Sequence, residues 1–257
     1  MKYTDKQISK LLDGIFNGSI TEFDLPLDYY NAVADYLKAG LYKGFGMDMA
    51  QAIEVGGKDL ALLEQLRENV YMFSAAKTYQ EVKEISSLLV DGDGNVRTSQ
   101  EFNKIGRETY DTWNNDYGKT EYNTAVGQGT MAVKWNEIES NKEVLPLLQY
   151  SAVIDANTSD ICEPLDGMVA KVDDPVWDSI MPLNHFNCRC TVLQLDEGEP
   201  TENRADIVAE VEDKMQPLFV NNAGKTGEVF TKDHPYFDAP KDLGKVNFNL
   251  PIKDKDD

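Results

Sequence analysis

Long hydrophobic runs are missing from this sequence of 257 residues. None approaches the roughly 18 consecutive apolar residues that cross a bilayer, and the first ten residues lack the apolar core of a secretory signal. We therefore expect a protein that folds in the cytosol without a membrane anchor. Basic residues are also scarce, with 25 Lys and Arg against 45 Asp and Glu. The resulting net charge of −20 repels phosphate backbones and disfavours generic nucleic-acid binding.

Cysteine and histidine are rare, with three and two residues respectively. An odd number of cysteines cannot form a complete disulfide framework within one chain, which indicates a reducing compartment. A phosphate-binding loop is missing as well, because the sequence Gly224-Lys225-Thr226 has Phe219 where such a loop needs its first glycine. The 41% of hydrophobic residues nevertheless suffices for a buried core in one or two domains.

The first half of the chain carries the residue spacing of amphipathic helices. Thr4 with Gln7, and Thr98 with Glu101, form capping boxes that open two of these helices. The pattern predicts that residues 1 to about 140 are predominantly helical. Glycines mark weak points in the last of these helices, at Gly118, Gly127 and Gly129.

The segment Asp91–Asn95, of sequence DGDGN, interrupts the helical pattern. Its alternating carboxylates are similar to the start of a calcium loop, but the glycine and glutamate expected later in such a loop are Val96 and Phe102. Asp, Gly and Asn also favour a plain turn that needs no metal. The plain turn is the preferred interpretation, with a calcium loop as the alternative.

Short apolar stretches with strand character follow at residues 145–154, 167–172 and 189–195. Residues 173–187 are expected to form an ordered loop with one short helical turn. A helix is predicted for residues 205–215 and disorder for residues 253–257. The predicted fold class is α+β, with a mainly helical N-terminal half, a small β-containing Cys/His module and an extended C-terminal segment.

Candidate metal ligands gather between residues 162 and 190, at Cys162, His185, Cys188 and Cys190. Three sulfurs and one nitrogen complete a tetrahedral zinc site. Cys188 and Cys190 lie two positions apart at the start of the strand expected over residues 189–195, so in an extended backbone both thiols would project to the same face. The sequence leaves three interpretations open: bound zinc, buried thiols packed beside a hydrogen-bonded histidine, and a disulfide formed after release from the cell.

A zinc-dependent hydrolase or nucleic-acid-processing enzyme is the alternative function. It would need an open coordination position, whereas the four ligands available here would close the shell. The H-x-E and P-C-x-x-C arrangement of zinc deaminases is absent. His185 near Asp155 or Asp160 would be the general base of a metal-free enzyme. We expect that the protein is not an enzyme.

Three motifs stand out in the second half of the chain: Asp155–Cys162 (DANTSDIC), Leu165–Gly167 (LDG) and Pro182–Cys190 (PLNHFNCRC). Together they resemble the signature of the Mu F-like phage minor head proteins, also called the head-morphogenesis family. The segment Lys119–Val126 is similar to the helical lead-in of that family. The resemblance covers residues 91–196 and predicts this head-morphogenesis domain between a helical region, 1–90, and a C-terminal extension, 197–257.

The chain departs from the family pattern at two positions. Asn157 stands where the family usually has Arg, and Leu183 follows Pro182 where a second proline is frequent. Some relatives have Ser in place of the last cysteine, which makes Cys190 the weakest of the four candidate ligands.

The resemblance implies a minor capsid protein of a phage or prophage, attached to the portal protein and assisting head assembly or genome packaging and ejection. It further implies a place in the capsid interior or at the portal vertex after synthesis in the host cytoplasm. Other capsid proteins are further expected partners, while charge disfavours packaged DNA and no membrane is involved. We also expect a structural role for the motif, with Asp155 and Thr158 bonding backbone in a turn and Arg189 pairing with Asp155 or Asp166.

Overall fold

The computed structural model describes residues 3–252 of the chain. The disorder predicted for residues 253–257 lies outside this range. Contacts group the chain into two units, each built from separate segments of the sequence. We call them the helical unit (Met1–Ala39, Val70–Tyr122 and Pro235–Asp257) and the mixed unit (Gly40–Asn69 and Asn123–His234).

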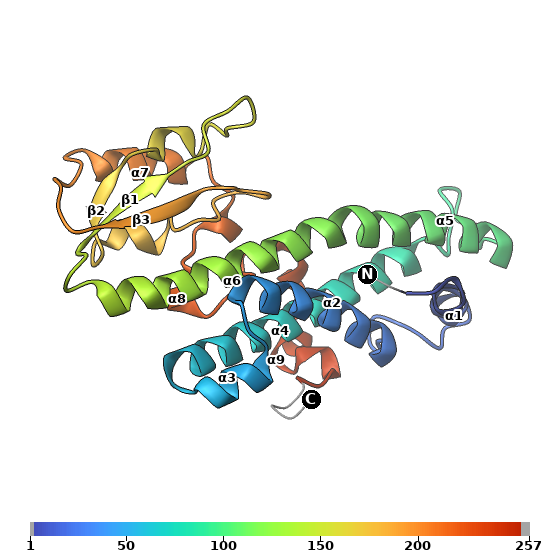
Figure 1. Ribbon diagram of the computed structural model, residues 1–257. Helices are drawn as coiled ribbons and strands as arrows, with labels where there is room; N and C mark the ends of the chain where they lie inside the picture. Colours follow the sequence, from blue (N-terminus) through green and yellow to red (C-terminus); the bar gives the residue numbers. More distant parts are fainter. Residues whose placement is uncertain (1–2, 253–257) are drawn as a thin grey trace. The chain divides into compact units, whose positions relative to one another are not determined.

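Helices dominate the described residues up to Asn141, as Figure 1 shows. They are α1 (Asp5–Phe16), α2 (Leu27–Phe45), α3 (Met49–Val55), α4 (Gly57–Ser87), α5 (Ser99–Asp111) and α6 (Gly118–Asn141). A π-helical turn, Thr112–Tyr117, joins α5 to α6. Among the described residues, none of the helices combines the length and apolar character needed to cross a membrane. The prediction of a predominantly helical first half is confirmed.

Local capping explains where α1 and α5 begin. The Thr4 hydroxyl accepts the backbone N–H of Gln7, whose side chain accepts the backbone N–H of Thr4 in return. Thr98 and Glu101 form the same reciprocal pair at the start of α5. Each box satisfies two backbone donors that the first helical turn leaves without a partner. Both predicted capping boxes are therefore confirmed.

Asp91 closes the turn that follows α4. Its Oδ1 accepts the backbone N–H groups of Asp93, at 3.0 Å, and Asn95, at 2.8 Å. These hydrogen bonds, the one from Asn95 first, lower the pKa of Asp91. On either side Val90 and Val96 pair as an antiparallel bridge. The carboxylate is engaged by its own backbone, so the geometry is that of a plain turn, and it breaks the helices at the predicted place.

Glycines allow α2 and α6 to approach closely inside the mixed unit. A Cβ atom placed on Gly44 would lie 1.9 Å from the carbonyl oxygen of Val126, and one placed on Gly129 would lie 2.8 Å from that of Leu41. Neither distance is tolerable for a carbon atom, so both positions require glycine. Of the glycines predicted as weak points, Gly118 is the first residue of α6, directly after the π-helical turn, and the helix runs unbroken through Gly127 and Gly129.

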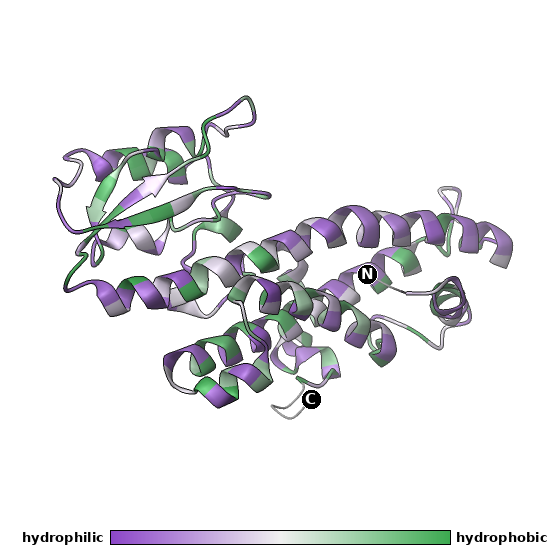
Figure 2. Cartoon of the chain, viewed as in Figure 1, coloured by the Kyte–Doolittle hydropathy of each residue, from purple (hydrophilic) through white to green (hydrophobic). Residues whose placement is uncertain are grey.

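A small antiparallel sheet confirms the predicted strands. Its strands are β1 (Leu147–Ser151), β2 (Val169–Lys171) and β3 (Thr191–Leu195), in the order β2-β1-β3. In the register of the sheet, Leu148 lies opposite both Ala170 and Gln194. Figure 2 shows hydrophobic residues, in green, on these strands.

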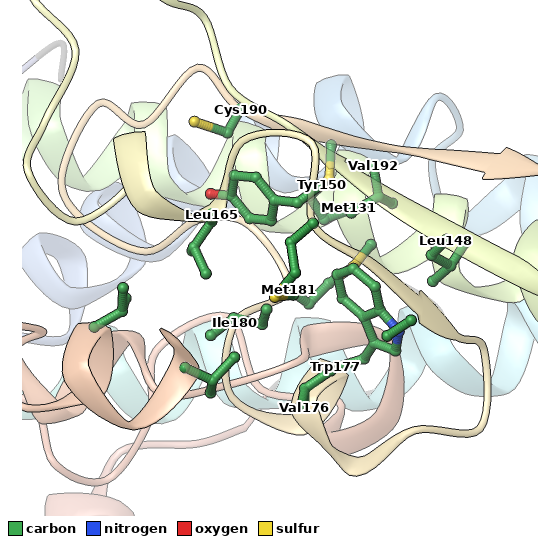
Figure 3. Packing of buried hydrophobic residues seen from close by; sticks show 14 of the residues in the cluster. Met131, Leu148, Tyr150, Leu165, Val176, Trp177, Ile180, Met181, Cys190 and Val192 are labelled. Carbon is green, nitrogen blue, oxygen red and sulfur yellow. The ribbon is translucent and has the colours of Figure 1, made fainter. Parts of the chain in front are cut away.

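The core of the mixed unit lies against one face of this sheet. Tyr150 of β1 and Val192 of β3 are fully buried there, together with Trp135 from α6. A short 3-10 turn, Pro175–Asp178, adds Trp177 from the loop for which one helical turn was predicted. Figure 3 shows this cluster, with Tyr150 and Trp177 among its labelled side chains.

Short helices follow the sheet. They are α7 (Arg204–Glu212), α8 (Ala223–Thr226) and α9 (Lys241–Lys245). Helix α7 confirms the helix predicted over residues 205–215. The overall α+β class, with a helical N-terminal half before the sheet, is confirmed as well.

The C-terminal return, which we define as residues 235–252, packs onto the helical unit. The Tyr236 hydroxyl donates to Glu121 of α6 at 2.9 Å. The Tyr30 hydroxyl of α2 donates to the carbonyl oxygen of Pro251 at 2.7 Å. The helical unit therefore consists of three stretches of chain that are far apart in the sequence.

A buried polar network lies in the helical unit. Lys77 and Glu121 form an ion pair at 2.7 Å, and their residues are 1% and 4% exposed. The neighbouring Glu81 is fully buried and accepts hydrogen bonds from the Tyr29 hydroxyl, at 2.6 Å, and from Asn114 Nδ2, at 3.0 Å. Burial raises the pKa of Glu81 to about 7 despite the opposing influence of Lys77. No motif in the sequence indicates this network.

Candidate metal centre

Two loops of the mixed unit bring the cysteines together. Cys162 lies in the loop between β1 and β2, while Cys188 and Cys190 lie in the segment that leads into β3. The first loop is shaped by a tight turn, in which the Thr158 hydroxyl accepts the backbone N–H of Asp155 at 2.6 Å. The Thr158 hydroxyl also donates to the carbonyl oxygen of Asp155. The structural role predicted for Thr158 in this turn is confirmed.

The three sulfur atoms converge within 4.8 Å of one another. Those of Cys162 and Cys188 are 3.8 Å apart, which is far longer than the roughly 2.05 Å of a disulfide bond. Two thiolates that each lie about 2.3 Å from one zinc ion at the tetrahedral angle stand about 3.8 Å apart. Cys162 and Cys190 are buried, whereas Cys188 is partly exposed. The spacing and the soft donor set therefore fit a zinc ion.

His185 lies at the edge of this cluster. A hydrogen bond to the Cys188 sulfur raises the pKa of His185. Its Nδ1 is 2.9 Å from the carbonyl oxygen of Phe186, an arrangement that leaves Nε2 for the sulfur. The histidine does not belong to the group of donor atoms that all lie within 4.8 Å of one another. The structure thus groups the three predicted thiol ligands and places the fourth predicted ligand beside one of them.

The three cysteine thiols differ in the direction of their pKa shifts. Hydrogen bonds from Cys162 and Cys190 hold the pKa of Cys188 well below its usual range. The bond to Cys188 is also the main reason why the pKa of Cys162 is raised. Because the thiolate is the form that coordinates metals, Cys188 is the sulfur best prepared for a cation.

An ion pair ties the two cysteine-bearing loops to each other. Arg189 donates to both carboxylate oxygens of Asp155, each at 2.7 Å. This bidentate contact is the main cause that lowers the pKa of Asp155 to about 2, and the backbone N–H of Asn157 assists. The pairing predicted for Arg189 is confirmed with Asp155 as the partner. It holds the Cys162 loop against the segment that contains Cys188.

The space beside the cluster is small. A cavity of about 30 Å³ is lined by residues that include Cys162, His185, Arg189 and Cys190. It can hold a water molecule or an ion, whereas pockets for organic ligands typically measure about 300 Å³ or more. Of the two partners considered for His185 as a general base, Asp155 and Asp160, Asp155 is instead engaged by Arg189. The size of this cavity therefore matches an ion or a water molecule.

Two further residues, which no sequence motif indicates, lie against the cysteines. The Tyr150 hydroxyl is 2.6 Å from Asn184 Oδ1 and 3.4 Å from the sulfur of Cys162. Both residues are fully buried, and burial is the main reason that the pKa of Tyr150 is raised. Figure 3 shows Tyr150 near Cys190 in the buried cluster. The one available signal was the position of Tyr150 on the apolar face of a predicted strand.

Comparison with known proteins places these features in a family. The family model described as Phage Mu protein F like protein matches residues 43–193. The Mu-like prophage FluMu F protein of Haemophilus influenzae is 33% identical over 66 residues, which are 26% of this chain and 16% of that protein. The protein of Escherichia phage Mu that is named capsid assembly protein F is 31% identical over 122 residues, which are 45% of this chain and 26% of that protein.

The chain thus matches about a quarter or less of the length of these two relatives. No solved structure matches. The family match covers more than half of the chain and includes the three cysteines and His185. The resemblance inferred from the sequence motifs is therefore confirmed, and the chain belongs to the family of Phage Mu protein F like proteins.

Proposed function

We propose that this protein is a minor head protein of a phage or prophage, which binds the portal protein and assists head assembly or genome packaging and ejection. The observation that supports this role most directly is the family match over residues 43–193. The similarity to a phage Mu protein named for capsid assembly points in the same direction. In this proposal the protein is made in the host cytoplasm and enters the virion, in the capsid interior or at the portal vertex.

A structural role agrees with the chemistry of the molecule better than a catalytic one. The cavity beside the cysteines, of about 30 Å³, has no room for an organic substrate. The net charge of −20 disfavours direct binding to packaged DNA and favours protein partners. Other capsid proteins are the second class of expected partner.

We place the portal contact in the helical region, residues 1–90. Large apolar side chains are exposed there, and Phe23 and Leu27 are 66% and 49% exposed. Exposed apolar side chains next to amphipathic helices are typical of surfaces that dock in a groove of another protein.

Co-expression with the portal protein encoded by the same phage tests the proposal. The wild-type protein should co-purify with portal through affinity capture and gel filtration. The double variant Phe23→Ser/Leu27→Ser should lose most of this association. Val144→Ser is the matched control, because Val144 is 74% exposed but lies outside residues 1–90. Failure of the wild-type protein to bind portal would reject the proposed partner, and unchanged binding by the double variant would reject the proposed surface.

We also propose that Cys162, His185, Cys188 and Cys190 hold a structural zinc ion. The convergence of the three sulfurs within 4.8 Å supports this assignment, as does the histidine beside Cys188. When bound, the ion would cross-link loops that the sheet itself leaves free. Metal binding to such a site contributes directly to the free energy of folding.

Metal content of the protein purified under reducing conditions tests the zinc proposal. We expect about one zinc per chain, a lower melting temperature after chelation, and the same loss in Cys162→Ser. His185→Gln should weaken zinc binding, whereas His234→Gln replaces the other histidine of the chain and should leave it unchanged. Zinc well below one per chain would reject the site. A thiol titration would then separate buried free cysteines, with three reactive groups after unfolding, from a disulfide, with one.

A further inference from the structure

A side-chain amide with two unused hydrogens lies next to the cysteine cluster. The Asn184 side chain is fully buried, and its Nδ2 has no hydrogen-bond partner among residues 3–252. Its Oδ1 accepts the Tyr150 hydroxyl at 2.6 Å, and its backbone N–H bonds to the sulfur of Cys188. Buried amide donors in folded proteins are nearly always satisfied, so the unused Nδ2 group calls for a physical reason.

The Tyr150 hydroxyl has one hydrogen but two acceptors within reach. Asn184 Oδ1 lies at 2.6 Å, a separation typical of an O–H···O bond, and the Cys162 sulfur lies at 3.4 Å. While the hydrogen points to Asn184, the sulfur receives none from Tyr150. A cysteine that coordinates a cation carries no hydrogen of its own and becomes a strong acceptor. The Cys162 sulfur would then compete more strongly with Asn184 Oδ1 for the Tyr150 hydrogen.

A half-turn of the Asn184 amide about its last side-chain bond would free the Tyr150 hydroxyl to donate to the Cys162 sulfur. Such a rotation exchanges Nδ2 with Oδ1 and needs no movement of the backbone. Nδ2 would then donate to the Tyr150 oxygen, and the hydroxyl hydrogen would be free to point to Cys162. The result is a continuous chain of hydrogen bonds from amide to hydroxyl to sulfur, which uses one of the two Nδ2 hydrogens that now lack a partner.

We propose that Tyr150, held by Asn184, is a positioning residue that donates its hydroxyl hydrogen to the Cys162 thiolate when the cysteine cluster binds zinc. This inference rests on the zinc proposal above. Partners of this kind fix the orientation of metal ligands, and their loss typically weakens metal affinity about 10–100-fold. Tyr150 is buried in the core, so the hydrogen bond forms without competition from bulk water.

Zinc affinity of Tyr150→Phe, measured by competition with a chromophoric chelator, tests the proposal. The variant keeps the ring in the core and removes only the hydroxyl, so zinc should bind about 10–100-fold more weakly. Tyr30→Phe is the matched control, because Tyr30 is also fully buried and its hydroxyl bonds to Pro251 in the helical unit. The control should bind zinc with wild-type affinity. Wild-type affinity in Tyr150→Phe would overturn the proposal.

A second measurement uses the wild-type protein and remains decisive if Tyr150→Phe does not fold. In protein loaded with an NMR-active cadmium isotope, the Tyr150 hydroxyl hydrogen should show scalar coupling to the metal through the Cys162 sulfur. A slowly exchanging hydroxyl signal without this coupling would overturn the role of Tyr150. The two proposals are distinguishable, because a wild-type protein that binds neither metal refutes the zinc site itself, whereas binding without coupling refutes only the role of Tyr150.

Discussion

A carboxylate that is removed from water needs charge and hydrogen bonds from the protein around it. Glu81 has both, since Tyr29 and Asn114 donate to it and Lys77 lies close enough to favour its charged form. Burial nevertheless outweighs these contributions and raises the pKa of Glu81 from 4.5 to about 7. The folded protein therefore binds a proton in the neutral range that the unfolded chain has already released.

We predict that the raised pKa of Glu81 makes the folded protein less stable as the pH rises. Between pH of about 4.5 and 7 the folded state holds more protons than the unfolded state, so the free energy of unfolding falls with increasing pH. A shift of this size corresponds to at most about 3 kcal/mol. Glu81→Gln should remove this part of the slope when denaturant unfolding is measured at several pH values. Glu143→Gln, at an exposed position, should keep the wild-type slope. An unchanged slope in Glu81→Gln would contradict the prediction.

The site residues that could be predicted from the sequence are those whose residue type alone indicates metal binding or ion pairing. Cysteines and histidine are rare and clustered here, and Arg189 has few acidic residues close to it in the motif. Tyr150 and Asn184 are common residue types separated by 34 positions, so only the packing of a loop against β1 brings them together. Glu81 and Tyr29 are 52 positions apart and escaped for the same reason.

Among the elements, those with local signals were the easiest to predict. Capping boxes and the DGDGN turn depend on residues within a few positions of each other, and both were placed correctly. Helix α3 was not recognised as a separate helix, although Asp48 and Gln51 form a capping box at its start. Its seven residues are too few to show a helical period.

We predict opposite effects for two glycine substitutions in the helices. Gly44→Ala should destabilise the protein by about 1–3 kcal/mol or more, because its new methyl group would collide with the Val126 carbonyl. Gly118→Ala should stabilise it by up to about 1 kcal/mol, because its Cβ would meet only the Trp113 carbonyl oxygen at an ordinary 3.6 Å while helix propensity improves. Thermal unfolding of both variants measures the difference. Equal stabilities would show that the two helices can separate at little cost.

At the scale of the whole molecule, contacts do not follow the order of the sequence. The helical unit combines residues from the beginning, the middle and the end of the chain. Sequence patterns report local structure and motif boundaries, so they could not reveal this arrangement. The division into residues 1–90, 91–196 and 197–257 was drawn from the extent of a family resemblance, and it remains a prediction.

The C-terminal return is the last part of the helical unit to be synthesised, so this unit cannot be completed until late in translation. Residues 235–252 leave the ribosome only after the entire mixed unit. The hydrogen bonds from Tyr236 to Glu121 and from Tyr30 to Pro251 can therefore form only at that stage. Until then the nascent helical unit lacks part of its own core. The unit that is started first is therefore the one completed last, and a chaperone acting during translation would encounter it unfinished although every segment of the sheet has already been synthesised.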